Sequence, residues 1–404
     1  MSNKHLQVSH LGEKKLIDRI IKKSKNFYDS KNFNKDSDNN INNIDSINNA
    51  SDFTCYIGDD AALINFNKNI NDEDKGDSYL VATSDLLLEK SHFPKEMSYF
   101  QMGWKVVVVN VSDLAAMGAN PTGILINLAI PPELKLSYFD EIIDGILNAC
   151  HEYNIPLVGG DTNQADQIII SGTALGKVEK TKAIKKSGFK EGDLIAITGE
   201  LGLAALGFEI LKEENIKTIK DGLKNKQISQ EIVDLAIEKA LKPEAKLDEG
   251  VALNQFVSSA TDITDGLASE LYELYNADKI NNRDSNLGLR IYEEKIATEP
   301  IFKEIYKVSK ILNKDPLDLV LHVGEDFELL FTFDRDLINN TNSNNTNSNN
   351  TNNNLNINVD NINNNFNNIN FIVIGEINNF NKVEIEYSNG KTEELSSKGY
   401  EHLS

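Results

Sequence analysis

The sequence of 404 residues is poor in cysteine, in positive charge and in long apolar stretches, and each shortage excludes a class of protein. Two cysteines, Cys55 and Cys150, are too few for a disulfide framework or a thiolate metal site. No run of about 18 apolar residues is present, so we expect no membrane span. The first residues lack the apolar stretch of a secretory signal. We therefore expect a cytoplasmic protein with two reduced, buried thiols.

Positive charge is in deficit, with 41 Lys and Arg against 62 Asp and Glu and a formal net charge of −21. Affinity for a phosphate backbone comes largely from Lys and Arg, so we expect no nucleic-acid partner. A small phosphorylated ligand stays possible, because a bound cation can reverse the local sign of the charge.

Motifs of the common nucleotide-binding and nucleophilic enzymes are also absent. No Gly-x-x-x-x-Gly-Lys-Ser/Thr loop occurs, which excludes a P-loop protein. No His-Arg-Asp or Asp-Phe-Gly set occurs, which excludes a protein kinase. Cys55 precedes an acidic cluster, which raises the pKa of its thiol and argues against a nucleophilic role.

Asparagine is abundant in two tracts, with 20 Asn among residues 339–370 and 8 among residues 30–50. Such tracts bury too little apolar area to offset the cost of ordering the chain. We expect both to be mobile surface insertions. They divide the chain into an N-terminal helical arm (1–29), an insertion (30–50), a first domain (51–180) and a second domain (181–404) that the other insertion (339–370) interrupts.

The two domains alternate apolar segments of strand and helix character. Strands are predicted at residues 79–83, 124–130, 157–158, 168–175 and 193–198, and helices at 11–23, 101–117, 138–153 and 203–211. Gly118 is expected to end the second helix. Residues 106–109 within that helix are ambiguous, because β-branched side chains favour strands. The alternation indicates two α/β or α+β domains.

Six short acidic clusters each couple Asp to Gly, Ser or Thr, and they lie at residues 58–61, 83–85, 110–113, 159–162, 261–266 and 324–326. A single cluster of this kind is typical of an ordinary turn. Asp85 and Asp161, however, each follow an apolar strand segment, and Asp113 lies within an apolar helix. Carboxylates from distant parts of the chain can therefore converge on one site.

Converging carboxylates repel one another and raise one another's pKa values. Divalent cations relieve this repulsion, and Mg²⁺ is commonly held by a few carboxylates together with substrate phosphates. The nearby glycines allow backbone N–H groups to approach phosphate oxygens. The sequence therefore predicts an acidic site that binds a phosphorylated ligand through Mg²⁺.

Taken in order, the motifs resemble the thiamine-monophosphate kinase family, within the aminoimidazole ribonucleotide synthetase superfamily. The segments are IGDDAALI at 57–64, VATSDLLLEKSHF at 81–93, GWKVVVVNVSDLAAMGANP at 103–121, VGGDT at 158–162, GDLIAITGELGLAALG at 192–207, TDITDGL at 261–267, GEDFELLFTF at 324–333 and KGYEHL at 398–403. The resemblance implies a two-domain synthetase-like fold, α/β followed by α+β. It also implies transfer of the γ-phosphoryl group of ATP onto thiamine monophosphate, which gives thiamine diphosphate. The oligomer it implies is a homodimer that pairs through the N-terminal domain.

The resemblance also implies roles for single residues. Ligands of several Mg²⁺ ions are implied at Asp60, Thr83, Ser84, Asp85, Asp113, Asp161, Asp262 and Asp265. The implied catalytic residues among them are Asp60, Asp85, Asp113, Asp161 and Asp265. Contacts to ATP are implied at Gly160, Lys186 and Thr264, and contacts to the substrate at His92, Glu325 and Tyr400. Glu325 is expected to face the thiazolium charge, and Tyr400 to supply an aromatic wall.

The chain departs from the family pattern in two places. Lys186 stands where the family has Arg, which keeps the charge but loses the bidentate fork. The family's Pro-x-Pro-Arg segment reads Lys-Pro-Glu-Ala-Lys at 242–246. Both changes bear on nucleotide affinity and choice, not on the reaction class. Two alternatives remain open: a superfamily member that uses ATP on another small substrate, and a non-catalytic protein that binds nucleotide or metal.

Overall fold

The computed structural model describes residues 15, 19–20, 22–23, 59–65, 78–297, 301–339 and 369–397. The described residues between 15 and 23 are helical, in agreement with the predicted arm. The rest of the arm, the 30–50 insertion, Cys55, nearly all of the 339–370 insertion and Tyr400 lie outside the described residues. Among the helices that the structure describes, none has the length and apolar character needed to cross a membrane.

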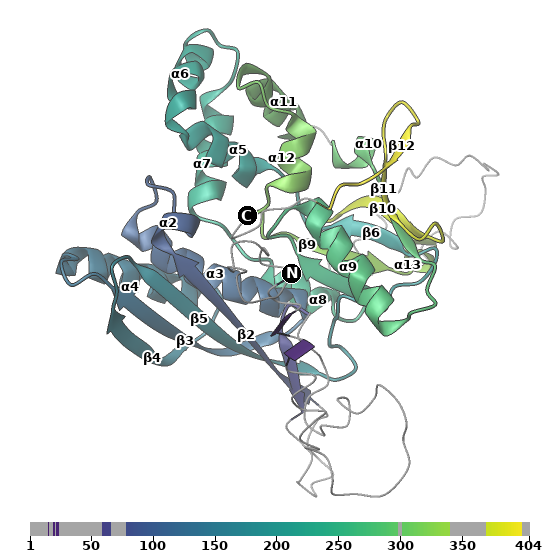
Figure 1. Ribbon diagram of the computed structural model, residues 1–404, viewed down its shortest axis with the longest axis horizontal. Coiled ribbons are helices and arrows are strands. Elements are labelled where there is room, and N and C mark those ends of the chain that lie inside the picture. Colours follow the sequence, from purple (N-terminus) through teal and green to yellow (C-terminus); the bar gives the residue numbers. More distant parts are fainter. Residues whose placement is uncertain are drawn as a thin grey trace, which may run out of the picture.

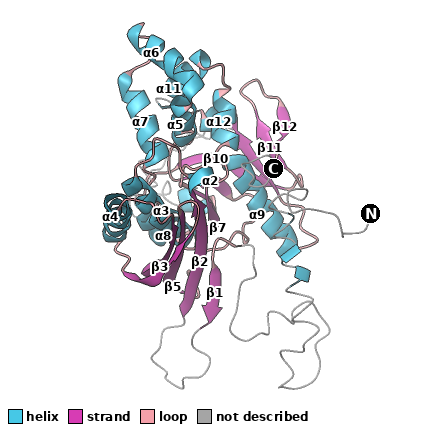
Figure 2. Cartoon of the chain, turned by 60° about the vertical axis from the view of Figure 1, so that its left-hand side comes forward, coloured by secondary structure: helices cyan, strands magenta, loops and turns pink. Residues whose placement is uncertain are grey.

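The first sheet has five strands in the order β1-β2-β5-β3-β4. They are β1 (Ala62–Asn65), β2 (Ser78–Leu88), β3 (Asn120–Ile130), β4 (Leu157–Gln164) and β5 (Ile169–Glu179). All neighbours are antiparallel except β3 and β4. Every second residue of β5 is buried, because α3 packs on one face of the sheet (Figure 2). The helices of this part are α2 (Glu89–His92), α3 (Tyr99–Ala116) and α4 (Leu136–Glu152), and α4 packs against α3.

The ambiguous run 106–109 is helical and lies in the middle of α3. Val106, Val107 and Val108 are fully buried, so the burial of apolar area outweighs their preference for strands. Ser98 and the side chain of Gln101 form a capping box at the start of α3. Gly118, with a φ of +65°, lies just after the C-cap residue Met117, so the helix stops where the sequence predicts.

The second sheet has seven strands in the order β12-β11-β8-β10-β6-β9-β7, antiparallel except for the pair β8 and β11. They are β6 (Leu194–Ile197), β7 (Val257–Asp262), β8 (Gly288–Tyr292), β9 (Leu329–Phe333), β10 (Ile372–Asn378), β11 (Val383–Glu386) and β12 (Thr392–Glu394). Helix α9 (Leu267–Asn281) packs on this sheet, and α10 (Glu293–Ile296) and α13 (Asp336–Asn339) lie at its margins (Figure 1).

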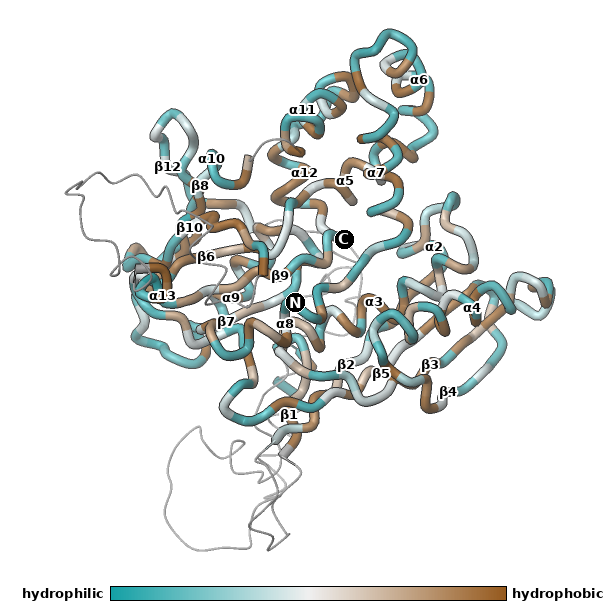
Figure 3. Tube along the Cα trace, turned by 180° about the vertical axis from the view of Figure 1, so that it is seen from behind, coloured by the Kyte–Doolittle hydropathy of each residue, from teal (hydrophilic) through white to brown (hydrophobic). Residues whose placement is uncertain are grey.

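A separate group of helices extends beyond both sheets (Figure 1). It comprises α5 (Leu203–Leu211), η4 (Glu213–Asn215), α6 (Ile216–Lys224), α7 (Gln230–Leu241), α11 (Ile301–Ile311) and α12 (Pro316–His322). These helices enclose a small core of their own around Leu206 and Ile305. The chain is mostly hydrophilic around α6, whereas β6 within the second sheet is hydrophobic and buried (Figure 3).

Helix α3 also connects the two sheets. It contacts β2 and β5 of the first sheet, β7 of the second sheet, and the short helix α8 (Leu247–Leu253). Residues near the end of β7 therefore lie beside residues of α3 and of the start of β1. This junction brings together four of the acidic clusters, at residues 58–61, 83–85, 110–113 and 261–266.

Candidate active site

Three carboxylates from distant segments meet at the junction of the two sheets. Asp60 precedes β1, Asp113 lies in α3, and Asp262 ends β7. One oxygen atom of each lies within 4.8 Å of the others, a spacing that suits a shared cation. We call Asp60, Asp113 and Asp262 the acid cluster.

The acid cluster is electrostatically strained without a cation. Burial, followed by repulsion from Asp85, Asp262 and Asp60, raises the pKa of Asp113 well above its ordinary range. Burial and the charge of Asp60 raise the pKa of Asp262 to about 7 and that of Asp85 to about 6. The Oδ2 atom of Asp60 is buried, and no described group hydrogen-bonds to it. A divalent cation satisfies that oxygen and removes the repulsion, so the residues present fit a metal site.

Hydroxyl groups hold the acid cluster in position. Thr83 Oγ1 donates a hydrogen bond to Asp113, and Ser112 Oγ donates to Asp262 Oδ2 at 2.5 Å. Thr261 Oγ1 donates to Asp60 Oδ1 at 3.1 Å. The sequence predicted Thr83 as a ligand, but it did not single out Ser112 or Thr261. Their only signal was their position next to an Asp.

Lys186, the predicted contact to ATP, pairs with Asp60 of the acid cluster. Its Nζ lies 2.8 Å from Asp60 Oδ1, and the two side chains are 10% and 5% exposed. Burial lowers the pKa of Lys186, but the carboxylates of Asp60, Glu270 and Glu273 outweigh burial and leave that pKa well above its usual value. In this structure Lys186 therefore acts as the counter-ion of Asp60.

The segment that carries Thr264 and Asp265 is held by Glu270, which the sequence did not single out. Glu270 Oε1 accepts a hydrogen bond from the N–H of Asp265 at 3.1 Å. Burial raises the pKa of Glu270 well above its ordinary value; Lys186 lowers that pKa, and Asp265 and Asp262 raise it further. Its only sequence signal was an acidic residue in the first turn of α9.

His92 and Glu325, two predicted substrate contacts, lie on either side of one buried lysine. Lys105 Nζ donates to both carboxylate oxygens of Glu325 and to the main-chain oxygen of His92. The His92 ring accepts a hydrogen bond at Nδ1 from the N–H of Leu88, at 3.0 Å. The one sequence signal for Lys105 is that it stands beside an apolar run. That signal does not indicate its partners His92 and Glu325.

Other predicted ligands lie on the opposite face of the first sheet from the acid cluster. In the strand register, Asp161 of β4 lies opposite Asn127 of β3, Asn127 lies opposite Ser171 of β5, and Ser171 lies opposite Leu86 of β2. Leu86 is 55% exposed. Cross-strand partners share a face, so this row lies opposite the row of Asp85. Ser84 points to the same open face, where its Oγ contacts Thr173 Oγ1 at 2.9 Å. Within one chain, Ser84 and Asp161 are not brought to the acid cluster. Gly160, next to Asp161, lies in the exposed edge strand β4.

The altered segment 242–246 contacts other parts of the same chain. Trp104 Nε1 donates to the main-chain oxygen of Pro243 at 2.7 Å, and Lys242 Nζ lies 4.2 Å from the Trp104 ring centroid. Lys246 pairs with Glu328 at 3.3 Å. These contacts tie α3 to the segment before α8, which gives the segment a structural role.

Asp326 should make the stability of the protein depend on pH. Its carboxylate accepts the N–H of Gly202 at the start of α5, with both oxygens at 3.1 Å. Burial raises its pKa to about 7; the N–H groups of Gly202 and Ala204 oppose the rise, and Glu328 and Glu325 add to it. The folded state therefore binds more protons than the unfolded state between pH 4 and 7, so stability falls as the pH rises through this window.

The loss assigned to Asp326 is about 2 kcal/mol, roughly half of what three pKa units give, because the side chain keeps some contact with solvent. Asp326→Asn keeps an acceptor for the helix N–H groups and removes the titration. Denaturant unfolding at pH 5 and pH 8 should show a smaller pH-dependent loss in the variant. Identical profiles for the two proteins would contradict the assignment.

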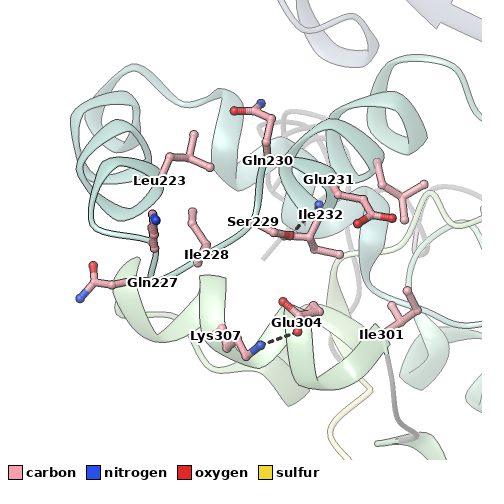
Figure 4. A pocket seen from close by; sticks show the side chains of 12 residues that line it. Leu223, Gln227, Ile228, Ser229, Gln230, Glu231, Ile232, Ile301, Glu304 and Lys307 are labelled. Carbon is pink, nitrogen blue, oxygen red and sulfur yellow. Dashed lines mark hydrogen bonds and ion pairs between the residues drawn. The ribbon is translucent and has the colours of Figure 1, made fainter.

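A groove of about 720 Å³ lies between the α6–α7 turn and α11. Leu223, Ile228 and Ile232 form its apolar wall, and Glu304 and Lys307 pair on its other side (Figure 4). None of the predicted site residues that the structure describes lines it. The groove is therefore separate from the candidate active site.

Comparison with known proteins agrees with this architecture. A family model described as AIR synthase related protein, N-terminal domain, matches residues 58–178. A thiamine-monophosphate kinase of Pyrococcus horikoshii is 35% identical over 284 residues, which cover 70% of this chain and 79% of that protein. One of Methanocaldococcus jannaschii is 33% identical over 279 residues, covering 68% and 79%.

The fold also matches solved structures. The structure titled "AaThiL complexed with AMPPCP and TMP" superposes with a TM-score of 0.70 at 24% identity and covers 99% of this chain and 100% of that one. The thiamine monophosphate kinase of Aquifex aeolicus superposes with a TM-score of 0.59 at 25% identity, covering 81% and 93%. These matches confirm the predicted synthetase-like fold.

Proposed function

Because this chain belongs to the thiamine-monophosphate kinase family, we propose that it transfers the γ-phosphoryl group of ATP to the phosphate of thiamine monophosphate. The products are thiamine diphosphate and ADP. The observation that carries the proposal is the acid cluster, in which the carboxylates of buried Asp262 and of partly buried Asp60 and Asp113 lie within 4.8 Å of one another and could hold a cation. A site of this kind suits phosphoryl transfer between two anions.

The proposed magnesium ligands are the acid cluster together with Asp85 and Asp265. The unsatisfied Oδ2 of Asp60 and the raised pKa values of Asp113 and Asp262 support this choice. Bound Mg²⁺ supplies neutralisation of the phosphate charges. Thr83, Ser112 and Thr261 hold the carboxylates in position for it.

The acceptor is a phosphate monoester, which is already nucleophilic near neutral pH, so the site requires no strong general base. The chain then contributes mainly binding and orientation. In the proposal, His92 and Glu325 contact the acceptor, and Thr264, Lys186 and Gly160 contact ATP. Lys186 Nζ lies 2.8 Å from Asp60 Oδ1, and an ammonium group has three donors, so Lys186 can keep this ion pair while it contacts ATP. The proposed compartment is the cytoplasm, which supplies ATP.

The test is incubation with thiamine monophosphate, Mg²⁺ and ATP labelled in the γ position. We expect one labelled thiamine diphosphate for each ADP, no labelled protein, and no reaction in excess EDTA. Hydrolysis of ATP without thiamine diphosphate would favour a superfamily member with another substrate. Binding of ATP without turnover would favour the non-catalytic alternative.

We also propose a homodimer that pairs through the open face of the first sheet. Leu86, Leu157 and Val158 expose 55%, 38% and 57% of their surface on or near this face. Apolar residues grouped on one sheet face are typical of a surface that another chain covers. Asp161, predicted from the sequence as a ligand, lies in the same row as Leu86 and therefore on the proposed dimer face.

Leu86→Asp should convert the dimer to a monomer, because it buries a charge in the proposed interface. Light scattering coupled to size exclusion should show the mass fall by about half. Ile280→Asp, at a residue 74% exposed on α9, is the matched control and should leave the mass unchanged. A wild-type protein that is monomeric at micromolar concentration contradicts the proposal.

A further inference from the structure

One buried ammonium group joins two residues that the proposed function assigns to the acceptor. Lys105 lies in α3, and its side chain is 1% exposed. Its Nζ lies 2.7 and 2.8 Å from the two carboxylate oxygens of Glu325, and 2.9 Å from the main-chain oxygen of His92. An ammonium group has three donors, so all the donors of Lys105 are used within the protein.

A lysine at this depth requires such partners. The next residue, Val106, is fully buried, and a charge in apolar surroundings is costly unless it is paired and hydrogen-bonded. The ion pair with Glu325 spans 220 residues of sequence, from the first sheet's principal helix to the loop before β9. Lys105 therefore fixes how the two halves of the acceptor region lie relative to each other.

The loop that carries Glu325 is held at its backbone as well. Gly324, Glu325 and Phe327 have φ angles of +80°, +60° and +51°. This left-handed region is sterically unfavourable for the two non-glycine residues. The N–H of Glu325 donates to the main-chain oxygen of Thr264 at 2.8 Å, and a Cβ on Gly324 would approach that same oxygen to 2.2 Å. Glu325 is thus held at its main chain by the hydrogen bond to Thr264 and at its carboxylate by Lys105.

We propose that Lys105 is a positioning residue for the acceptor, holding Glu325 and the His92 turn in one arrangement. This inference rests on the proposed function. Lys105 occupies two of the roughly four lone-pair positions of the Glu325 carboxylate. Glu325, whose side chain is 28% exposed, therefore presents its remaining positions as hydrogen-bond acceptors. Its negative charge is already paired and is not left free to face the thiazolium cation.

The test is a double-mutant cycle with Lys105→Met and Glu325→Gln, measured by steady-state kinetics in both substrates. Lys105→Met should raise the KM for thiamine monophosphate about tenfold or more, because a charged hydrogen bond is lost. The KM for ATP should change less than about twofold. In the Glu325→Gln background, Lys105→Met should raise this KM less than about threefold, because only the contact with His92 is then left to lose.

Additive effects of the two substitutions, or equal increases in both KM values, would overturn the inference. If the Lys105→Met variant fails to fold, the comparison of Glu325→Gln with the double variant still tests the inference. The double variant should fold because it leaves no unpaired buried charge. A difference of about tenfold in KM between Glu325→Gln and the double variant also overturns it. Lys307→Met, which removes a lysine paired with Glu304 on α11, is the matched control and should leave both KM values unchanged.

Calorimetric binding of thiamine monophosphate without ATP separates this inference from the proposed function. A wild-type protein that binds the compound but does not phosphorylate it disproves the proposed function, and the cycle can then be run on binding affinity. A wild-type protein that neither binds nor phosphorylates it disproves both.

Discussion

Asp113→Asn is expected to lower kcat about 10²–10³-fold while making the metal-free protein more stable. Burial and the negative charges of Asp85, Asp262 and Asp60 raise the pKa of Asp113. A neutral amide removes that repulsion, and its Oδ1 can still accept the hydrogen bond from Thr83. The same change removes one carboxylate that the proposed magnesium site requires.

The two effects should be measured separately. The gain in metal-free stability should be about 1 kcal/mol or more in EDTA, and it should be larger at pH 8 than at pH 5. The sign follows because the stability lost to a raised carboxylate pKa accumulates as the pH rises from the ordinary carboxylate pKa towards the raised pKa of Asp113. Denaturant unfolding gives the stability, and thiamine diphosphate formation gives kcat.

Asp140→Asn, at an exposed position of α4, is the matched control for Asp113 and should change neither quantity. An Asp113→Asn variant that keeps more than about a tenth of the wild-type kcat would be inconsistent with a role in catalysis. A loss of stability in EDTA would show that Asp113 is not under repulsion in the free protein.

Lys186→Met is expected to destabilise the metal-free protein by about 3 kcal/mol, and Mg²⁺ should restore most of that loss. The ammonium group lies 2.8 Å from Asp60, within a side-chain environment that is nearly closed to solvent. Without it, the carboxylates of Asp60 and Glu270 lose their nearest cation. A metal ion bound at the acid cluster can take over this role.

Thermal unfolding with and without Mg²⁺ measures both parts of the prediction. The shift caused by Mg²⁺ should be larger for the variant than for the wild type, because the metal no longer competes with the lysine for Asp60. Lys182→Met removes a lysine that pairs with Glu179 at the surface, and it should leave both unfolding curves unchanged. Equal Mg²⁺ shifts in wild type and Lys186→Met would mean that Lys186 is not the counter-ion of Asp60.

Much of the acidic site was predictable because its signals are local. Asp60, Asp113 and Asp262 each occur in an unusual context, next to apolar segments or within one, and ordered motifs carry the family resemblance. Lys105 and Glu270 carry weak local signals, because a lysine in a helix or an acidic residue in a first helical turn is ordinary until its partners are known. Lys105 meets Glu325 across 220 residues, and only packing can bring such residues together.

Residue type and order alone determined the reaction family, the helix stop at Gly118 and the need for a cation among clustered carboxylates. These follow from charge, capping and motif order, which are properties of neighbouring residues. Only the tertiary structure decided which carboxylates share a site. Strand order and register set Asp161 on the face opposite Asp85, although the two follow similar apolar strands. Tertiary packing also made Lys186 the counter-ion of Asp60 and Lys105 the partner of Glu325, because a buried charge must find its opposite wherever the fold supplies it.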